Sequence, residues 1–253
     1  MPEWWTDFFD ADYFRVWGNF TNAERTAGEV DGLWQLLGLH QGSRLLDAPC
    51  GFGRLSRPLA ERGAIVLGLD QSETLLDYAE KQRANLNTER LRYRQHDLRQ
   101  PLLEGDFDAA INVFSSLGYG TAEDDLAILR NLGSALRPGG FLLVETAHRD
   151  LNIANLVRGA GMSQRLPDGT LVLHEFSFDP IAGRASVTWF WSGPAGGGQK
   201  SASIRIYSAT ELVALIERAG LRFCSAHRGC SPEPFKFEPP DFSARLGILA
   251  ERV

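Results

Sequence analysis

The sequence has too few cysteines for a disulfide-stabilised fold. Cys50, Cys224 and Cys230 are the only three in 253 residues, and three cysteines do not make a disulfide framework. We therefore expect a protein of a reducing, cytoplasmic compartment. Cys224, His227 and Cys230 also lack the spacing of a common zinc motif, so the sequence predicts no metal site.

Long apolar runs and an excess of positive charge are missing too. No run approaches the roughly 18 apolar residues of a membrane span. The opening residues MPEWWTDFFDADYFRVW lack the basic and apolar regions of a signal peptide, so we expect neither feature. The formal net charge of −6 disfavours a nucleic-acid partner. An aromatic cluster near the start of the sequence comprises Trp4, Trp5, Phe8 and Phe9. It would suit a surface that binds a partner or a membrane, although the acidic residues around it argue against binding to anionic lipid.

From Arg44 onward, strand-like and helix-like segments alternate along the chain. Ser72 and Thr121 are predicted helix N-caps. This alternation predicts an α/β fold with a mostly parallel sheet. The predicted strands are 44–49, 64–70, 107–114 and 140–147, and the predicted helices are 73–86 and 122–137.

The pattern changes near residue 150, where alternating apolar residues predict antiparallel strands at 170–179, 184–192 and 201–207. A glycine-rich stretch at 193–200 is predicted to be a flexible loop.

In the last part of the chain, helix-like and strand-like segments follow one another again, as they do after Arg44. Ser208 and Glu211 form a predicted capping box that opens a helix at 209–220, and strands follow at 221–228 and 243–252. We therefore expect one domain in four parts: a helical cap (1–43), a core (44–149), an inserted antiparallel sheet (150–207) and a segment that completes the core sheet (208–253).

Acids and glycines follow the first two predicted strands. Asp47 ends the first strand, Gly51 and Gly53 come after it, and Asp70 ends the second strand. Ligands bind beyond the carboxyl ends of such strands, and glycines allow a close approach. The Asp47 carboxylate would repel the pyrophosphate of a dinucleotide but attract an ammonium or sulfonium group. This charge argument favours S-adenosylmethionine over NAD, with Asp70 accepting hydrogen bonds from the ribose.

Five segments in sequence order resemble the class I S-adenosylmethionine-dependent methyltransferases. LLDAPCGFGR resembles the first motif of that family, VLGLDQS the second, QHDL the third and FDAAINVFSSLG the fourth, while LRPGGFLLVE resembles the element leading to the fifth strand. Pro49 stands where the family usually has glycine. The resemblance implies a Rossmann-like seven-stranded sheet and S-adenosylmethionine as cofactor, with S-adenosylhomocysteine as product. It further implies an enzyme that transfers a methyl group by in-line displacement to an oxygen, nitrogen or carbon atom of a small molecule.

The matching positions imply a set of cofactor-binding residues, and the amino-terminal segment resembles the variable cap of the family. The expected residues are Asp47, Pro49, Cys50, Gly51, Gly53, Arg54, Asp70, Gln71, Ser72, His96, Asp97, Leu98, Asn112 and Phe114 from the core, with Arg25 and Thr26 from the cap.

Fewer sequence features indicate which residues bind the methyl acceptor. His148, which follows the fifth strand, is a candidate general base, and Tyr119 is the second candidate catalytic residue. We expect the inserted sheet to form a lid over the carboxyl edge of the core sheet, with a homodimer interface as the alternative. The expected substrate-binding residues are Ser115, Tyr119, His148, Arg149, Trp189, Trp191, Arg205 and Tyr207.

Three other functions stay open at this point. The acceptor could be a protein or an RNA, although the acidic charge disfavours RNA. A non-catalytic cofactor-binding scaffold would keep the same motifs. A Rossmann oxidoreductase is disfavoured by Asp47 and by the missing G-x-G-x-x-G pattern.

Overall fold

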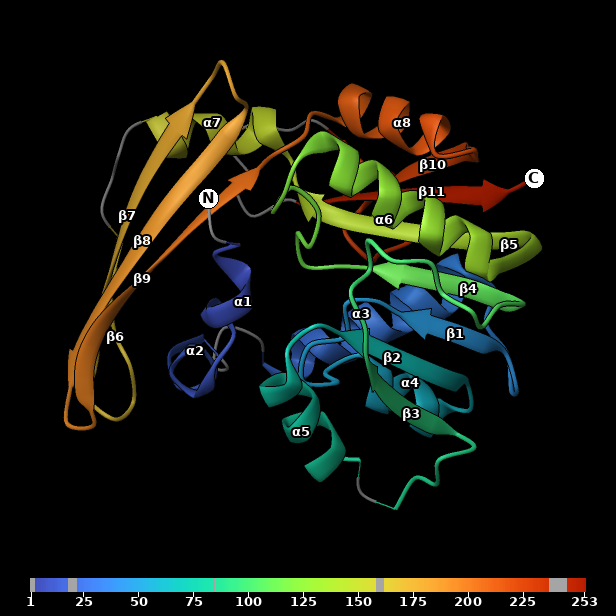
Figure 1. Ribbon diagram of the computed structural model, residues 1–253, viewed down its shortest axis with the longest axis horizontal. Helices are drawn as coiled ribbons and strands as arrows, with labels where there is room; N and C mark the ends of the chain where they lie inside the picture. The colour runs from blue at the N-terminus through green and yellow to red at the C-terminus, as the bar shows by residue number, and fades with distance from the viewer. Residues whose placement is uncertain (1–2, 18–21, 84, 158–161, 237–244) are drawn as a thin grey trace.

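The chain folds into two sheets joined by helices (Figure 1). The computed structural model describes residues 3–17, 22–83, 85–157, 162–236 and 245–253. The core sheet and its helices comprise β1 (Arg44–Asp47), α4 (Ser56–Arg62), β2 (Ile65–Asp70), α5 (Glu73–Lys81), β3 (Leu91–Gln95), β4 (Phe107–Asn112), α6 (Ala122–Ala135), β5 (Leu136–Ala147), α8 (Ala209–Arg218), β10 (Leu221–Arg228) and β11 (Arg245–Arg252).

The core sheet has seven strands in the order β10-β11-β5-β4-β1-β2-β3. Strands β1 to β5 are parallel to one another, and β11 is antiparallel to both β5 and β10. The prediction of a seven-stranded, mostly parallel sheet is therefore confirmed. The strand order reverses between β1 and β4, and such a switch point places a crevice at the carboxyl ends of the strands.

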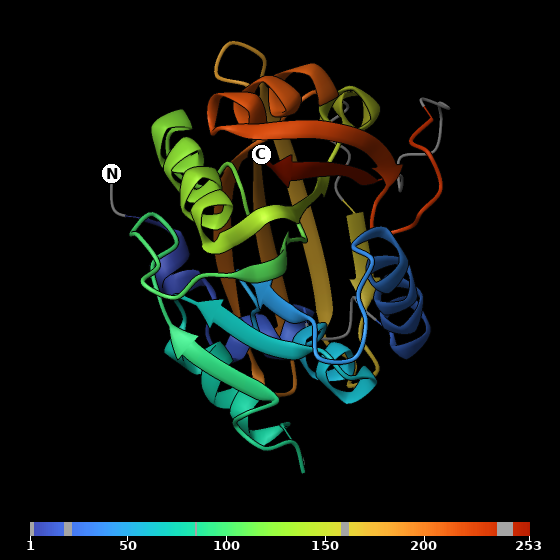
Figure 2. The same ribbon diagram turned by 90° about the vertical axis from the view of Figure 1, so that its right-hand side faces the viewer.

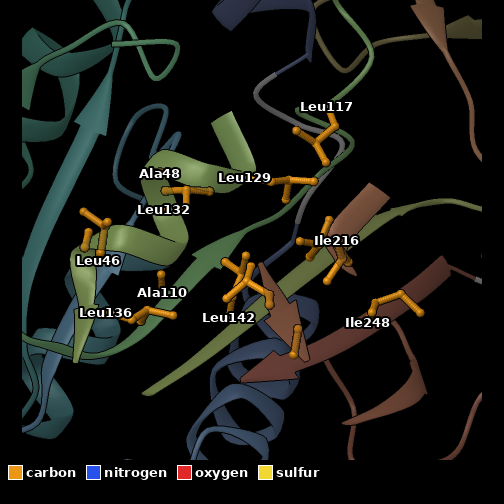
Figure 3. Packing of buried hydrophobic residues seen from close by; sticks show 14 of the residues in the cluster. Leu46, Ala48, Ala110, Leu117, Leu129, Leu132, Leu136, Leu142, Ile216 and Ile248 are labelled. Atoms are coloured by element: carbon orange, nitrogen blue, oxygen red, sulfur yellow. The ribbon is translucent and has the colours of Figure 1, made fainter. Parts of the chain in front are cut away.

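Helices cover both faces of the core sheet, which is why the central strands β1, β2 and β4 are mostly apolar and buried. Leu45 of β1 points to the face covered by α3 (Ala23–Leu36) and α4, and Leu46 to the face covered by α6 and α8. Figure 2 shows α3 and α6 on opposite sides of the sheet. Figure 3 shows the hydrophobic cluster on the face of Leu46, where Leu129 and Ile216 pack against Leu142 of β5.

The second sheet is antiparallel and follows β5 in the sequence, as predicted. It has four strands in the order β6-β7-β8-β9, one more than expected, because residues 162–165 pair with β7. The glycine-rich loop prediction is wrong, since Gly196 to Lys200 pair with β8. The side chain of Trp191 covers Gly198, where a Cβ atom would lie 2.7 Å from the ring. The elements are α7 (Arg149–Val157), β6 (Met162–Arg165), β7 (Leu171–Asp179), β8 (Arg184–Gly193) and β9 (Gly196–Arg205).

Two short helices, α1 (Trp5–Phe8) and α2 (Ala11–Trp17), lie between the two sheets (Figure 1). The Trp4 indole donates a hydrogen bond to the Ser203 carbonyl of β9 at 3.1 Å. The Ser72 hydroxyl donates to the Phe9 carbonyl at 2.9 Å, which joins the same segment to the core. The amino-terminal segment therefore bridges the antiparallel sheet and the carboxyl edge of the core sheet. Within the described residues, no helix is long and apolar enough to cross a membrane.

Candidate active site

A cavity of about 410 Å³ opens at the carboxyl edge of the core sheet, beside the switch point. Ligand pockets typically enclose roughly 300–1,000 Å³, so this cavity has room for a cofactor. Thirteen of the residues expected from the sequence line it: Asp47, Pro49, Cys50, Gly51, Arg54, Asp70, Gln71, Ser72, His96, Asp97, Leu98, Phe114 and Tyr119.

Asp70 at the end of β2 shapes the floor of this cavity. One carboxylate oxygen accepts the Gly51 N–H at 2.8 Å, and the other accepts the Ser72 N–H at 2.9 Å. Burial raises the pKa of Asp70, although these two hydrogen bonds oppose the shift. Each oxygen has a second lone pair, so the carboxylate can hold the glycine turn and still accept from a ligand hydroxyl.

Asp47 at the end of β1 is fully buried beneath the same turn. The Ser56 hydroxyl donates a short hydrogen bond to its carboxylate. Burial raises the pKa of Asp47 to about 7, while the hydrogen bond from Ser56 and the charge of Arg54 act in the opposite direction. A cation in the cavity would favour the ionised form of this group.

The two glycines of the turn have different surroundings. Gly51 has a φ of +55° and lines the cavity, and a Cβ atom there would meet nothing within 4 Å. Gly53 has a φ of +77°, and a Cβ atom there would lie 2.2 Å from the Tyr93 hydroxyl. The structure therefore gives Gly53 a packing role away from the cavity wall, instead of the ligand contact expected from the sequence. Pro49 follows a cis peptide bond and lines the cavity.

The loop after β4 presents Phe114 to the cavity in a left-handed conformation, with a φ of +69°. The buried Glu145 carboxylate accepts the Phe114 N–H at 2.6 Å and pairs with the Arg245 guanidinium. Ser115 lies below this loop instead of on the cavity wall, because its hydroxyl accepts hydrogen bonds from Ala147 N–H at 3.0 Å and Arg245 at 2.8 Å. The Glu145–Arg245 pair thus holds the conformation that exposes the Phe114 ring.

Asn112 is buried at the end of β4 and does not reach the cavity wall. Its amide nitrogen donates to the Ala48 carbonyl at 2.8 Å, which ties β4 to the turn after β1. Its carbonyl oxygen has no hydrogen-bond partner within the described residues.

Arg54 carries positive charge into the cavity from the turn after β1. Its guanidinium pairs with Glu29 and donates to the Thr26 hydroxyl at 3.2 Å. Arg25 reaches the same Glu29 at 2.8 Å and lies 5.6 Å from the centre of the Phe114 ring. Arg25 and Thr26 therefore support Arg54 from α3 and are not themselves part of the cavity wall.

The end of β3 forms the opposite side of the cavity. The Asp97 carboxylate accepts from the Arg99 Nε at 3.0 Å, and this hydrogen bond lowers the pKa of Asp97 although burial opposes it. Arg99 also pairs with Glu3, so the amino-terminal segment is held to this strand end. His96 faces the Gln100 carbonyl through Nε2 at 3.1 Å.

Aromatic residues of the amino-terminal segment, which the sequence resemblance implies is a cap, line the cavity instead of forming a partner or membrane surface. Trp5, Phe9 and Tyr13 line it together with Tyr119. The Phe9 and Tyr119 rings are stacked with centroids 6.1 Å apart, and Trp4 lies 4.8 Å from Tyr119. The opening residues of the sequence are rich in apolar side chains. This pattern could have predicted that one face of a helix there packs against the core.

Comparison with known proteins agrees with this architecture. Residues 45–140 match the model of a family described as "Methyltransferase domain". The amino-pentose methyltransferase CalS10 of Micromonospora echinaspora, solved with S-adenosylmethionine bound, superimposes with a TM-score of 0.70 at 18% identity, over 96% of this chain and 97% of that one. Residues 45–140 thus resemble a methyltransferase domain, and the chain shares its fold with solved S-adenosylmethionine-dependent methyltransferases.

Curated relatives match this chain over only part of their own length. The putative methyltransferase YqeM of Bacillus subtilis is 28% identical over 64% of this chain and 66% of its own. The ubiquinone biosynthesis O-methyltransferase of Coxiella burnetii is 31% identical over 51% of this chain and 55% of its own. This chain therefore spans between about half and two thirds of the length of the curated relatives that it matches.

The cavity of this chain fits S-adenosylmethionine, the cofactor that the sequence resemblance implies. S-Adenosylmethionine has ammonium and sulfonium cations, and the Asp47 and Asp70 carboxylates lie in the cavity wall. The Arg54 guanidinium in the same wall is suited to a ligand carboxylate. The open space above Gly51 leaves room for a ligand to approach the backbone.

Of the expected acceptor-binding residues, the structure places only Tyr119 in the wall of the cavity. His148 is buried, its ring stacks on Phe235 at 5.1 Å, and its Nδ1 accepts the Leu151 N–H at 3.4 Å. Burial lowers the pKa of His148. Arg149 pairs with Asp150 and with Glu211, which fastens α7 to the start of α8. His148 and Arg149 therefore lie with α7, away from the cavity wall.

The remaining expected residues hold the inserted sheet in place. Trp191 is buried with Val16 of α2, and Trp189 packs on Phe8 of α1 at 5.2 Å. The Tyr207 hydroxyl donates to the buried Asp125 carboxylate, a residue of α6.

Arg205 lies over the Tyr207 ring at 5.1 Å. These residues link the inserted sheet to the amino-terminal segment and the core, and none of them lines the cavity.

Proposed function

We propose that this protein transfers a methyl group from S-adenosylmethionine to an oxygen, nitrogen or carbon nucleophile of a small molecule by in-line displacement. The observation that carries the proposal is the cavity at the switch point, where Asp47 and Asp70 flank a glycine turn that is open to a ligand. The names of the relatives agree, since one is an O-methyltransferase of ubiquinone biosynthesis and one methylates an amino pentose.

The residues of the chain would act mainly by binding and by excluding water. When bound, the cofactor supplies a methyl group that its sulfonium charge activates. Asp70 and Asp97 stand at adjacent strand ends, where they would orient a ribose and an adenine. Phe9 and Tyr13 would cover the cavity, and holding two reactants in one dry site supplies much of a rate enhancement.

Tyr119 would face the reacting atoms as a neutral phenol. Burial raises the pKa of Tyr119 well above its usual value, and the charges of Tyr13 and Asp70 add to the shift. At neutral pH this side chain donates a hydrogen bond and does not remove a proton. We therefore propose that Tyr119 orients the acceptor or the cofactor instead of acting as the base.

The test is methyl transfer from S-adenosylmethionine labelled in its methyl group to a panel of alcohols, amines and carbon acids. We expect label in a small-molecule product and a marked loss of label with Asp70→Asn. Asp77→Asn, an exposed acid of the neighbouring helix α5, is the matched control and should transfer label normally. Label that enters only added protein or RNA would contradict a small-molecule acceptor.

Three further statements about this protein belong to the same proposal. The three free cysteines suit a reducing cytoplasm. The inserted sheet would act as a lid through the amino-terminal segment, because Trp5 and Phe9 line the cavity and Trp4 joins this segment to β9 by its hydrogen bond to Ser203. A homodimer through the inserted sheet is the competing arrangement, and light scattering of the purified protein separates the two.

A further inference from the structure

One guanidinium of the inserted sheet is surrounded by backbone carbonyls of the loop that follows β4. Arg184 at the start of β8 donates to the carbonyls of Gly118 at 3.2 Å, Tyr119 at 2.9 Å and Gly120 at 3.1 Å. It also donates to the Ser203 carbonyl at 2.5 Å and to the Ser203 hydroxyl at 3.1 Å. A single side chain therefore binds three consecutive residues of the loop and the neighbouring strand β9.

The same loop approaches the inserted sheet closely. The Arg205 N–H donates to the Gly118 carbonyl at 2.8 Å, and the Gly118 N–H donates to the Asp125 carboxylate at 2.8 Å. Gly118 has a φ of +89°, and a Cβ atom there would lie 2.1 Å from the Arg205 carbonyl oxygen. Only glycine allows this contact, so the loop is built to sit against β8 and β9.

Three carbonyl dipoles converging on one point repel each other unless a cation or several donors lie between them. The planar guanidinium provides five N–H donors in a fixed geometry, which a lysine ammonium cannot reproduce. Tyr119 is the middle residue of the three, and its side chain lines the cavity against Phe9. The position of the Tyr119 side chain thus depends on Arg184.

We propose that Arg184 is a positioning residue, which fixes Tyr119 in the cavity wall and makes the inserted sheet part of the cofactor site. The inference rests on the proposed function for the identity of the cavity ligand. It assigns the inserted sheet a role in cofactor binding as well as in enclosing the acceptor. It also predicts that the effects of changing Arg184 and Tyr119 on binding are coupled.

The test is a double-mutant cycle with S-adenosylhomocysteine as the calorimetric probe. We expect Arg184→Ala and Tyr119→Ala each to weaken the binding of S-adenosylhomocysteine by about 5-fold or more. The double variant should bind it no more weakly than the single variant with the lower affinity. Arg184→Lys should fall between wild type and Arg184→Ala, because it keeps the charge and loses the planar fork. Arg165→Ala, which removes an exposed arginine from β6 of the same sheet, should bind like wild type.

Hydrogen exchange of the ligand-free protein gives a second readout that needs no cofactor. Amides of residues 116–120 should exchange faster in Arg184→Ala and Arg184→Lys than in wild type, and at the wild-type rate in Arg165→Ala. If Arg184→Ala does not fold, Arg184→Lys carries both measurements. A wild-type protein that binds no S-adenosylhomocysteine would sink the proposed function, whereas the exchange rates would still decide the role of Arg184. Unchanged exchange, or single effects that simply multiply in the double variant, would overturn the inference.

Discussion

Replacing the buried Asp47 by asparagine should stabilise the ligand-free protein at neutral and alkaline pH. Burial raises the pKa of this carboxyl from 3.8 to about 7, in spite of the Ser56 hydrogen bond and the Arg54 charge. Because the pKa is higher in the folded state, its contribution to stability is fully present below pH 3.8 and is lost as the pH rises through about 7. The shift of about three units corresponds to about 4 kcal/mol when the group is fully ionised.

Asparagine keeps an oxygen that can accept from the Ser56 hydroxyl, and it has no proton to lose. The difference in unfolding free energy between Asp47→Asn and wild type should therefore grow in favour of the variant by about 1.4 kcal/mol per unit between about pH 5 and pH 7. Urea unfolding followed by tryptophan fluorescence measures this difference at each pH.

Asp108→Asn is the matched control for the same measurement. Burial opposes the shift, but hydrogen bonds from Arg137 and the Arg44 backbone lower the pKa of Asp108. A carboxyl group whose pKa is lowered on folding stabilises the folded protein above the pKa of the unfolded state. This stabilisation is lost only as the pH falls through the pKa of the folded state. Between pH 5 and pH 7 the effect of Asp108→Asn should stay constant. A stability difference for Asp47→Asn that is equally constant over this interval would refute the reasoning.

Three further changes separate binding from folding. Asp70→Ala should weaken S-adenosylhomocysteine binding by about 1.5–3 kcal/mol, measured by calorimetry, because charged hydrogen bonds are lost; wild-type affinity in a folded variant would remove Asp70 from the site. Gly53→Ala should lower the melting temperature more than Gly51→Ala, because the added methyl group meets Tyr93 in the first case and open space in the second; equal melting temperatures would contradict this account of the turn. Tyr207→Phe should cost about 1–3 kcal/mol of stability in urea unfolding, since a buried carboxylate loses its donor, and an unchanged unfolding midpoint would count against it.

The core of the fold was predictable because its strands are buried on both faces. Such strands are continuous apolar runs, and helix starts follow from local chemistry. Ser72 and Thr121 cap their helices as predicted, and Ser208 forms the predicted capping box with Glu211. Alternation of strands and helices predicted a mostly parallel sheet, and the resemblance to a known family implied that it has seven strands.

The surroundings of the site were harder to predict because they depend on contacts between distant segments. Gly198 belongs to a strand, although its glycine-rich context is typical of a loop, since the Trp191 ring needs the space above it. His148 follows β5, where acceptor sites are common, yet tertiary packing places its ring on Phe235. The role of Arg184 in holding the loop had no local signal, because the three loop carbonyls that it binds lie more than sixty residues away in the sequence.

The central claim is that the cavity at the switch point binds S-adenosylmethionine and not a nicotinamide dinucleotide. Calorimetric titration of the wild-type protein with S-adenosylhomocysteine, and separately with NADH, tests it most directly. The account predicts saturable binding of S-adenosylhomocysteine at one site per chain, weakened by Asp70→Ala, and no binding of NADH, because the Asp47 carboxylate repels a pyrophosphate. Saturable binding of NADH without binding of S-adenosylhomocysteine would contradict it.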